Sequence, residues 1–207
     1  MRPTLAILER HQTGKQKGAR HPDGCLPTRE RRSSCFSVAP CAWALAERFV
    51  GESFSHASQC HHNCVMTKHP GYSSATLWHQ DIRYWSFDRP ELISAWFALG
   101  QEAAVNGALQ VIPESHVQEI DRGRLDSALF LRPELAENQP MIERAEAVNL
   151  KPGDLLLFHC RLFHAAGQNQ SRTGQIVAGV HLSRADNQPI PGTRSERLPS
   201  IPLVGPE

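Results

Sequence analysis

The sequence predicts a mainly β protein of the sandwich or barrel class, with the strand rhythm of a jelly roll. Many short apolar runs that contain β-branched and aromatic residues are separated by turn residues, which is typical of this class. Helical spacing is clear only early in the chain, over residues 41–49. The chain has 207 residues, of which 40% are hydrophobic, so it is long enough to bury one core.

The first 40 residues differ in composition from the rest. They hold eight Lys and Arg against three Asp and Glu, and they show neither helical nor strand periodicity. Because so little apolar surface cannot offset the entropy of ordering, we predict an irregular or disordered segment over 1–40 and a folded domain over 41–207. A basic, Ser-containing start also fits a transit peptide.

The folded part is predicted to consist of short strands joined by turns and loops. The expected strands are rich in β-prone residues and cover 64–67, 75–78, 92–99, 107–113, 146–150, 155–158, 163–166 and 176–182. The polar stretch 117–145 predicts a long excursion with one helix near 124–130. The Pro- and Ser-rich tail after Arg184 is expected to be irregular.

Charge and cysteine usage restrict the possible partners and compartment. A formal net charge of +1 gives no field that recruits nucleic acid or an anionic membrane. No apolar run is long enough to span a bilayer, and no signal-peptide pattern is present. The chain has six cysteines, which we expect to be free thiols in a reducing cytoplasm: Cys25, Cys35, Cys41, Cys60, Cys64 and Cys160.

Two histidines and one aspartate form a candidate metal site. His79 and Asp81 are two residues apart, a spacing that places both on one face of a strand. His164 follows in another predicted strand. Two imidazoles and one carboxylate form the facial triad of non-heme Fe(II) oxygenases, which leaves positions open for other ligands. A lone H-x-D also occurs in surface turns, and His159 is an alternative to His164.

Five ordered blocks resemble the phytanoyl-CoA dioxygenase family. They lie within WHQDIRYWSF, AWFAL, NGALQVIPESH and KPGDLLLFHCRLFHAAGQNQS, the last holding both a G-D-x-x-x-F-H block and a distal H-x-x-x-x-N. The resemblance implies a double-stranded β-helix, cupin-like in shape and with few flanking helices. It also implies Fe(II), 2-oxoglutarate as cosubstrate, and the use of O₂ to hydroxylate a small organic substrate.

The same resemblance assigns roles to single residues. It makes His79, Asp81 and His164 the Fe(II) ligands and places His159 in the preceding strand. It places Trp96 and Cys64 beside the cosubstrate. The run Cys60 to Cys64 also suggests zinc, but one C-x₃-C is incomplete for a structural zinc site.

The chain departs from the family pattern where the cosubstrate is held. Gln175 lies eleven residues after His164, where the family has an Arg that binds the distal carboxylate of 2-oxoglutarate. Because glutamine carries no charge, its presence is expected to weaken cosubstrate binding. Arg172 and Arg184 are candidates for the missing cation, or else surface residues. These facts leave open a non-catalytic relative that keeps the fold and perhaps the metal.

The region before the β-helix is also short compared with the family, and Glu114 replaces a family glycine. A tight turn that requires positive φ disfavours glutamate, so strain is expected at residue 114.

Overall fold

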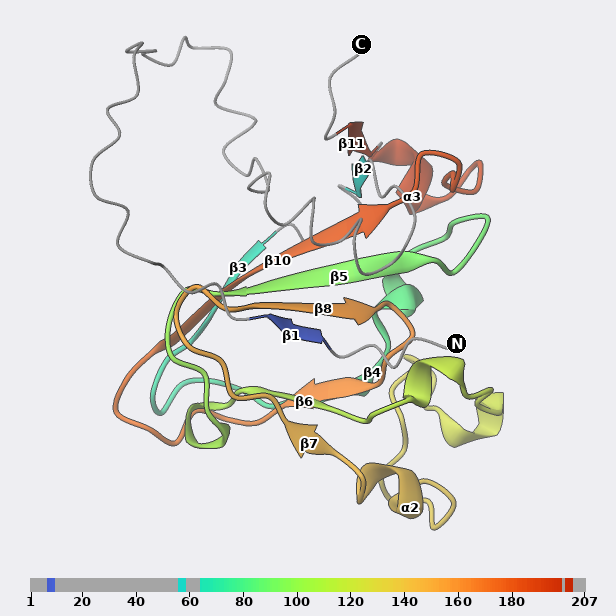
Figure 1. Cartoon of the computed structure of the whole chain (residues 1–207). Coiled ribbons are helices and arrows are strands. Elements are labelled where there is room, and N and C mark those ends of the chain that lie inside the picture. The colour runs from blue at the N-terminus through green and yellow to red at the C-terminus, as the bar shows by residue number, and fades with distance from the viewer. Residues whose placement is uncertain (1–6, 10–55, 59–63, 199, 203–207) are drawn as a thin grey trace, which may run out of the picture.

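The computed structural model describes residues 7–9, 56–58, 64–198 and 200–202. Its strands form two antiparallel sheets that lie one above the other (Figure 1). The helices are short and lie in the connections between strands. This arrangement confirms the predicted mainly β fold with few helices.

The larger sheet has seven strands among the described residues, in the order β1-β8-β5-β10-β2-β11, with β3 also paired to β10. Their bounds are β1 Ile7–Glu9, β2 His56–Ser58, β3 Cys64–Lys68, β5 Leu92–Ala98, β8 Leu155–His159, β10 Gln175–Ser183 and β11 Ile201–Pro202. Strand β10 is the longest and pairs with β5 along one edge. Along its other edge, β3 pairs with its first part and β2 with its last.

The smaller sheet has the order β4-β9-β6-β7. Its strands are β4 Thr76–His79, β6 Leu109–Val111, β7 Glu146–Ala147 and β9 His164–Ala166. Strands β4 and β9 pair so that His79 lies directly opposite His164, with an irregularity between Thr76 and His79. The register therefore brings together two histidines that are far apart in the sequence.

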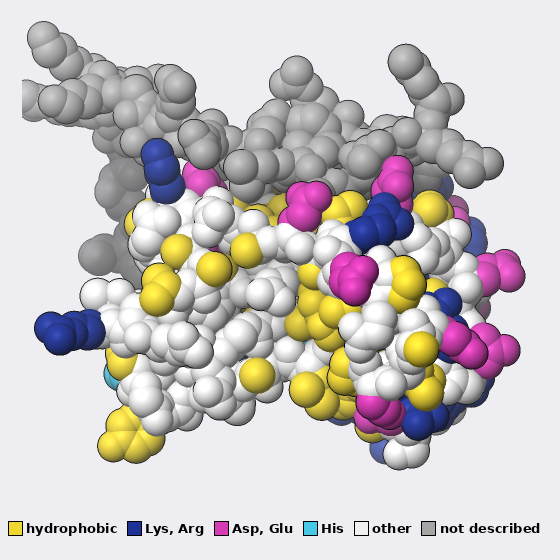
Figure 2. Space-filling model, turned by 90° about the horizontal axis from the view of Figure 1, so that it is seen from below, with side chains coloured by type: hydrophobic (Ala, Val, Ile, Leu, Met, Phe, Trp, Pro, Cys, Tyr) yellow, Lys and Arg dark blue, Asp and Glu magenta, His cyan; other side chains and the backbone are white. Residues whose placement is uncertain are grey.

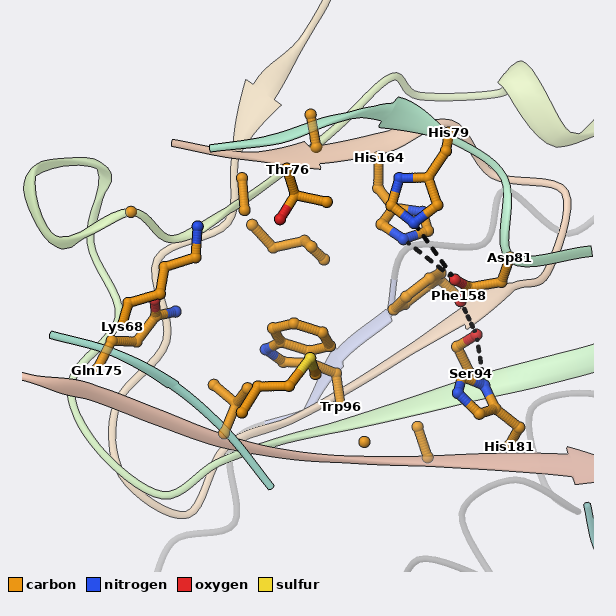
Figure 3. Close-up of a pocket in the computed structure, with 18 of the residues that line it drawn as sticks. Lys68, Thr76, His79, Asp81, Ser94, Trp96, Phe158, His164, Gln175 and His181 are labelled. Atoms are coloured by element: carbon orange, nitrogen blue, oxygen red, sulfur yellow. Dashed lines mark hydrogen bonds and ion pairs between the residues drawn. The ribbon is translucent and has the colours of Figure 1, made fainter. Parts of the chain in front are cut away.

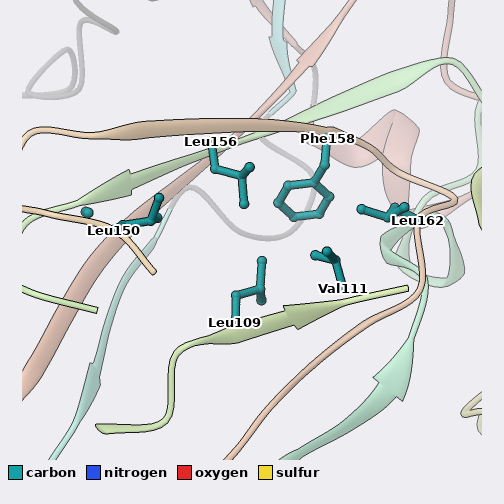
Figure 4. Packing of buried hydrophobic residues seen from close by; sticks show 7 residues of the cluster. Leu109, Val111, Leu150, Leu156, Phe158 and Leu162 are labelled. Atoms are coloured by element: carbon teal, nitrogen blue, oxygen red, sulfur yellow. The ribbon is translucent and has the colours of Figure 1, made fainter. Parts of the chain in front are cut away.

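Apolar side chains from both sheets fill part of the space between them (Figure 4). Leu156 and Phe158 point inward from the larger sheet, and Leu109 and Val111 point toward them from the smaller one. Leu156 and Phe158 are two residues apart in β8, as Leu109 and Val111 are in β6, so each pair projects from one face of its strand. The burial of these side chains fixes the two sheets face to face, since each buried methylene contributes roughly 0.8 kcal/mol.

The helices are single turns: η2 Asp81–Tyr84, η3 Ala104–Asn106, η4 Ser115–Val117, η5 Arg122–Arg124, α2 Gln139–Ile142 and α3 Arg194–Arg197. The helix predicted near 124–130 is wrong. The carboxylate of Asp126 accepts hydrogen bonds from the backbone N–H groups of Ala128 and Phe130, and Leu129 has a φ of 64°. An Asp that bonds the backbone locally in this way favours a turn over a helix.

Other boundaries also differ from the prediction. Residues 7–9, within the segment predicted to be disordered, form β1 paired with β8, because their backbone completes the edge of the larger sheet. The rest of 1–40 and the helix predicted over 41–49 lie outside the described residues. The strand predicted over 146–150 is regular only over two residues. None of the helices in the described part has the length and apolar character needed to cross a membrane.

Glu114 adopts the left-handed conformation, with φ at 61°. The strain that the sequence predicted at this position is therefore present. Gly107, at the N-G turn before β6, also has a positive φ of 83°.

Candidate metal centre

The structure brings His79, Asp81 and His164 together at one buried point between the sheets. Each offers one ligand atom, and these atoms all lie within 4.8 Å of one another. Asp81 Oδ1 lies 3.7 Å from His79 Nε2 and 3.4 Å from His164 Nε2. Figure 3 shows the three side chains pointing toward a common centre at one end of a cavity.

Asp81 reaches this centre by a route that differs from the predicted one. Strand β4 ends at His79, and Asp81 opens the 3₁₀ turn η2 instead of continuing the strand. The turn is fixed against the loop before β9, because the N–H of Ile82 donates to Cys160 O at 3.0 Å and the side chain of Gln80 donates to Arg161 O at 2.5 Å. The side chains of His79 and Asp81 therefore converge because His79 ends a strand and Asp81 begins the turn that follows it.

Backbone carbonyls orient both imidazoles. His79 Nδ1 lies 2.8 Å from Leu77 O, and His164 Nδ1 lies 3.0 Å from Leu162 O. A carbonyl only accepts, so each Nδ1 carries the hydrogen and each Nε2 keeps its lone pair. Such a partner behind a histidine is typical of metal ligands, because it fixes the tautomer and the ring orientation.

Ser94 and His181 support the carboxylate from behind. Ser94 Oγ donates to Asp81 Oδ2 at 2.6 Å and lies 3.1 Å from His181 Nδ1. Sequence reasoning missed both residues. A signal was available, since Ser94 is two residues before Trp96 on β5 and His181 is six after Gln175 on β10, and even spacing in a strand places residues on one face.

The electrostatics of the centre match a ligand set for a cation. Burial and the neighbouring His164 lower the pKa of His79 to about 4, so this imidazole is neutral. Burial alone would raise the pKa of Asp81, but His164, His181 and Ser94 hold it well below its usual range. Burial likewise opposes charge on His164, yet Asp81 raises its pKa. One carboxylate and two Nε2 lone pairs aimed at one point fit Fe(II).

The candidate metal centre opens into a cavity of about 190 Å³. Strand β10 contributes every second residue to its wall, namely Gln175, Val177, Gly179 and His181. Lys68 and Trp96 face the same space from the neighbouring strands β3 and β5. Figure 3 shows Lys68 and Gln175 at the end of the cavity away from His79, Asp81 and His164.

The residues predicted to hold the cosubstrate divide into two groups. Trp96 and Gln175 line the cavity. Arg172 is exposed in the turn before β10 and does not line it. Arg184 follows β10 at its other end, where its Nε donates to Asp186 at 2.8 Å. The structure thus brings neither arginine to Gln175, because the turn and the strand end direct both outward.

Two further predicted residues lie away from the centre or outside what can be described. The backbone of Cys64 pairs with Gly179 in β3, but its side chain lies outside the described residues, as does most of the Cys60 to Cys64 run. His159 faces His116, with ring centroids 5.6 Å apart, and its Nδ1 accepts from the N–H of Arg161. His159 therefore contacts His116 and Arg161 instead of the candidate metal centre, as expected from its place at the end of β8.

Glu102 is a site residue that sequence reasoning did not find. Its side chain is fully buried, and its carboxylate accepts from Trp96 Nε1 at 3.1 Å and from Gln175 Nε2 at 2.8 Å. Burial raises the pKa of Glu102 to about 7, although both hydrogen bonds oppose that shift. No sequence signal marked this residue, because it lies in a connection where glutamate is usually solvated.

Comparisons with known proteins agree with this geometry. The family model described as phytanoyl-CoA dioxygenase (PhyH) matches residues 10–175. The human peroxisomal phytanoyl-CoA dioxygenase (Homo sapiens) is 25% identical over 150 residues, which cover 66% of this chain and 43% of that protein. Phytanoyl-CoA dioxygenase 1 of Oryza sativa subsp. japonica is 25% identical over 115 residues, covering 56% of this chain and 41% of that protein. The chain thus spans about two fifths of the length of these curated relatives.

Solved structures share the fold. The non-heme alpha ketoglutarate dependent carbocyclase SnoK from nogalamycin biosynthesis aligns with a TM-score of 0.62 and 24% identity, over 80% of this chain and 66% of that one. The epimerase SnoN, solved with Fe³⁺, alpha ketoglutarate and nogalamycin RO, aligns with a TM-score of 0.63 and 23% identity, over 84% and 71%. Since the family model covers most of the sequence, this chain belongs to the phytanoyl-CoA dioxygenase family.

Proposed function

We propose that this chain is an Fe(II)- and 2-oxoglutarate-dependent dioxygenase that uses O₂ to hydroxylate a small organic substrate. The observation that carries the proposal is the convergence of His79, Asp81 and His164 on one point at the end of a buried cavity. The ion, when bound, supplies the activation of O₂. A carboxylate at position 81, rather than a small residue, favours hydroxylation over halogenation.

The protein's own contribution is orientation and the exclusion of water. The carbonyls behind His79 and His164 aim both Nε2 atoms at the ion, and Ser94 holds Asp81 Oδ2 so that Oδ1 faces it. Apolar side chains such as Phe158 line the adjoining cavity. In such surroundings the ligand charges are poorly screened, which strengthens their hold on a divalent ion.

Aromatic residues flank the histidine side of the centre. The ring of Tyr84 lies 6.0 Å from that of His79 and lines the cavity, and Phe130 lies 5.7 Å from His79. Arg83 stacks over Phe130 at 3.8 Å. These side chains are suited to contact an organic substrate beside the ion. Trp85, in contrast, is buried against His181 and serves packing.

The proposed partners and location are those of a small-molecule enzyme in the cytoplasm. On the face shown in Figure 2, acidic and basic side chains are interspersed without a large patch of one sign, which supports a small substrate over nucleic acid. The cytoplasmic location follows the expectation from the sequence that the six cysteines are free thiols.

A second candidate function is a non-catalytic relative that retains the fold and the metal. Gln175 favours it, because the amide stands where the family has the cation that anchors the cosubstrate. The two functions differ in whether the metal-loaded protein turns over 2-oxoglutarate.

Succinate release tests the proposal. The protein is incubated with Fe(II), 2-oxoglutarate and O₂, with and without candidate substrates, alongside Asp81→Ala and Asp88→Ala, which removes an exposed carboxylate. We expect succinate from the wild type and from Asp88→Ala, and none above background from Asp81→Ala. Iron binding without succinate release from the wild type would instead support the non-catalytic relative.

A further inference from the structure

At the end of the cavity away from the proposed metal ligands, the position of the family's arginine is occupied by the uncharged Gln175, and a lysine lies beside it. Resting on the proposed function, we propose that Lys68 of β3, and not residue 175, supplies the cation that binds the far carboxylate of the 2-oxo diacid cosubstrate. Nothing in the family pattern assigns this role to the lysine.

Register places Lys68 at the required position. Lys68 is the direct antiparallel partner of Gln175 in the β3–β10 pair. Side chains directly opposite one another in such a pair lie on the same face, with Cβ atoms about 5 Å apart. Lys68 therefore enters the cavity beside the position that the family gives to arginine, as Figure 3 shows.

Lys68 is also the only Lys or Arg among the described residues that line the cavity. Its Nζ donates to the carbonyls of Gly167 and Ser74, and no carboxylate of the described residues pairs with it. An ammonium group has three hydrogens to donate, so one remains for an anion. Partial burial lowers the pKa of Lys68, because an ammonium group held away from water loses part of its hydration.

Gln175 is poorly arranged to bind an anion. Its Nε2 donates to Glu102 Oε2 at 2.8 Å, while its Oε1 is buried without a hydrogen-bond partner among the described residues. An unpaired amide oxygen attracts a donor and repels a carboxylate. The carboxyl group of Glu102 behind the amide adds to that repulsion whenever it is ionised. The ammonium group of Lys68, in contrast, donates hydrogen bonds and carries a positive charge that attracts a carboxylate.

Two sequence motifs hold Lys68 in place. Asn169, the last residue of the H-x-x-x-x-N motif, donates to Lys68 O at 2.7 Å and to Thr173 O at 2.8 Å. Gly107 leaves room for the lysine, since a Cβ there would lie 2.6 Å from Gly167 O and 3.0 Å from Lys68 Cδ. The hydrogen bond from Asn169 thus fixes the backbone of Lys68, and the glycine at position 107 leaves space for its side chain.

Ligand titration of the metal-loaded protein without O₂ tests this assignment. Calorimetry compares 2-oxoglutarate with pyruvate, which keeps the 2-oxo acid group and lacks the far carboxylate. We expect Lys68→Met to weaken 2-oxoglutarate binding by about 10- to 100-fold, the value of a hydrogen bond to a charged group, and to leave pyruvate binding unchanged. Lys68→Arg, which keeps the charge, should retain most of the affinity. Lys151→Met, which removes an exposed lysine, should change neither ligand.

The other outcomes are also decisive. Equal 2-oxoglutarate affinity in the wild type and in metal-loaded Lys68→Met would overturn the role of Lys68 and leave the proposed function intact. Equal losses for 2-oxoglutarate and pyruvate would overturn it as well, because the lysine would then act on the whole site. A metal-loaded wild type that binds neither acid would overturn the proposed function, and the lysine assignment with it.

Discussion

Gln175 and Glu102 form a buried hydrogen bond of 2.8 Å at the end of the cavity away from the candidate metal centre. The residue that replaces the family's cosubstrate arginine is thus engaged by a carboxyl group of the protein itself. Trp96, which the sequence placed beside the cosubstrate, donates to the same carboxyl group. The three side chains are joined by hydrogen bonds through the buried carboxyl group of Glu102, whose titration gives the first prediction.

Stability should fall as the pH rises because of Glu102. Its pKa is raised from an ordinary 4.5 to about 7 by burial. The protonated carboxyl group of Glu102 therefore makes its full contribution to stability below pH 4.5, and that contribution is lost as the pH rises through about 7. At 1.36 kcal/mol per pKa unit the loss is on the order of 3 kcal/mol. Glu102→Gln should remove it, so urea unfolding at pH 5 and pH 8 should show a smaller difference in the variant.

The matched control for that experiment is Glu119→Gln, which changes an exposed glutamate. It should keep the wild-type difference between pH 5 and pH 8. If Glu102→Gln keeps that difference too, the carboxyl group does not titrate as its burial implies.

Asn169→Ala should destabilise the fold by about 1–3 kcal/mol. The substitution removes two partly buried hydrogen bonds, to the carbonyls of Lys68 and Thr173, and such a bond typically contributes about 0.5–1.5 kcal/mol. Gln168→Ala removes an exposed amide next to it and should be close to neutral. Chemical denaturation of both variants gives the comparison. Equal stability would show that Asn169 does not hold the two carbonyls.

Gly107→Ala should cost more stability than Gly153→Ala. Both glycines have positive φ, at 83° and 91°, so both substitutions strain the backbone by about 1 kcal/mol or more. Only at Gly107 would the new Cβ also meet a backbone atom, at 2.6 Å, whereas nothing lies within 4 Å at Gly153. Thermal unfolding measures the difference, and equal losses would mean that the close approach to Gly167 is relieved at little cost.

Glu114→Gly should stabilise the protein. Glu114 has a φ of 61°, which glycine adopts without steric cost, and the gain is about 0.5–1 kcal/mol after the greater flexibility of the unfolded chain is counted. The exposed ion pair with Arg144, at 3.4 Å, contributes little. Arg144→Ala removes that pair, and a long hydrogen bond of 3.5 Å to Pro113 O, without changing residue 114, and it serves as the control. A Glu114→Gly variant less stable than the wild type would argue against strain at this turn.

The sequence was sufficient to predict most strands of the two sheets and to select the three residues of the candidate metal site, whereas β1, β2 and β11 were not predicted. Apolar, β-prone runs identified β5, β8 and β10, and the resemblance of the surrounding blocks to the family selected His79, Asp81 and His164 as candidate ligands. The position of Asp81 in a turn was missed, since the pattern does not say where the strand ends. Glu102 and the role proposed for Lys68 were missed because they depend on which strands pair and in what register, and no single segment carries that information.

We propose that His79, Asp81 and His164 bind one Fe(II) between them. Metal titration under anaerobic conditions tests this binding in the wild type and in His79→Ala, His164→Ala and His159→Ala. We predict one ion per chain in the wild type and in His159→Ala, and a loss of more than 10-fold in affinity in the other two, with all four proteins folded. Wild-type affinity in His79→Ala and His164→Ala, or loss only in His159→Ala, would contradict the account.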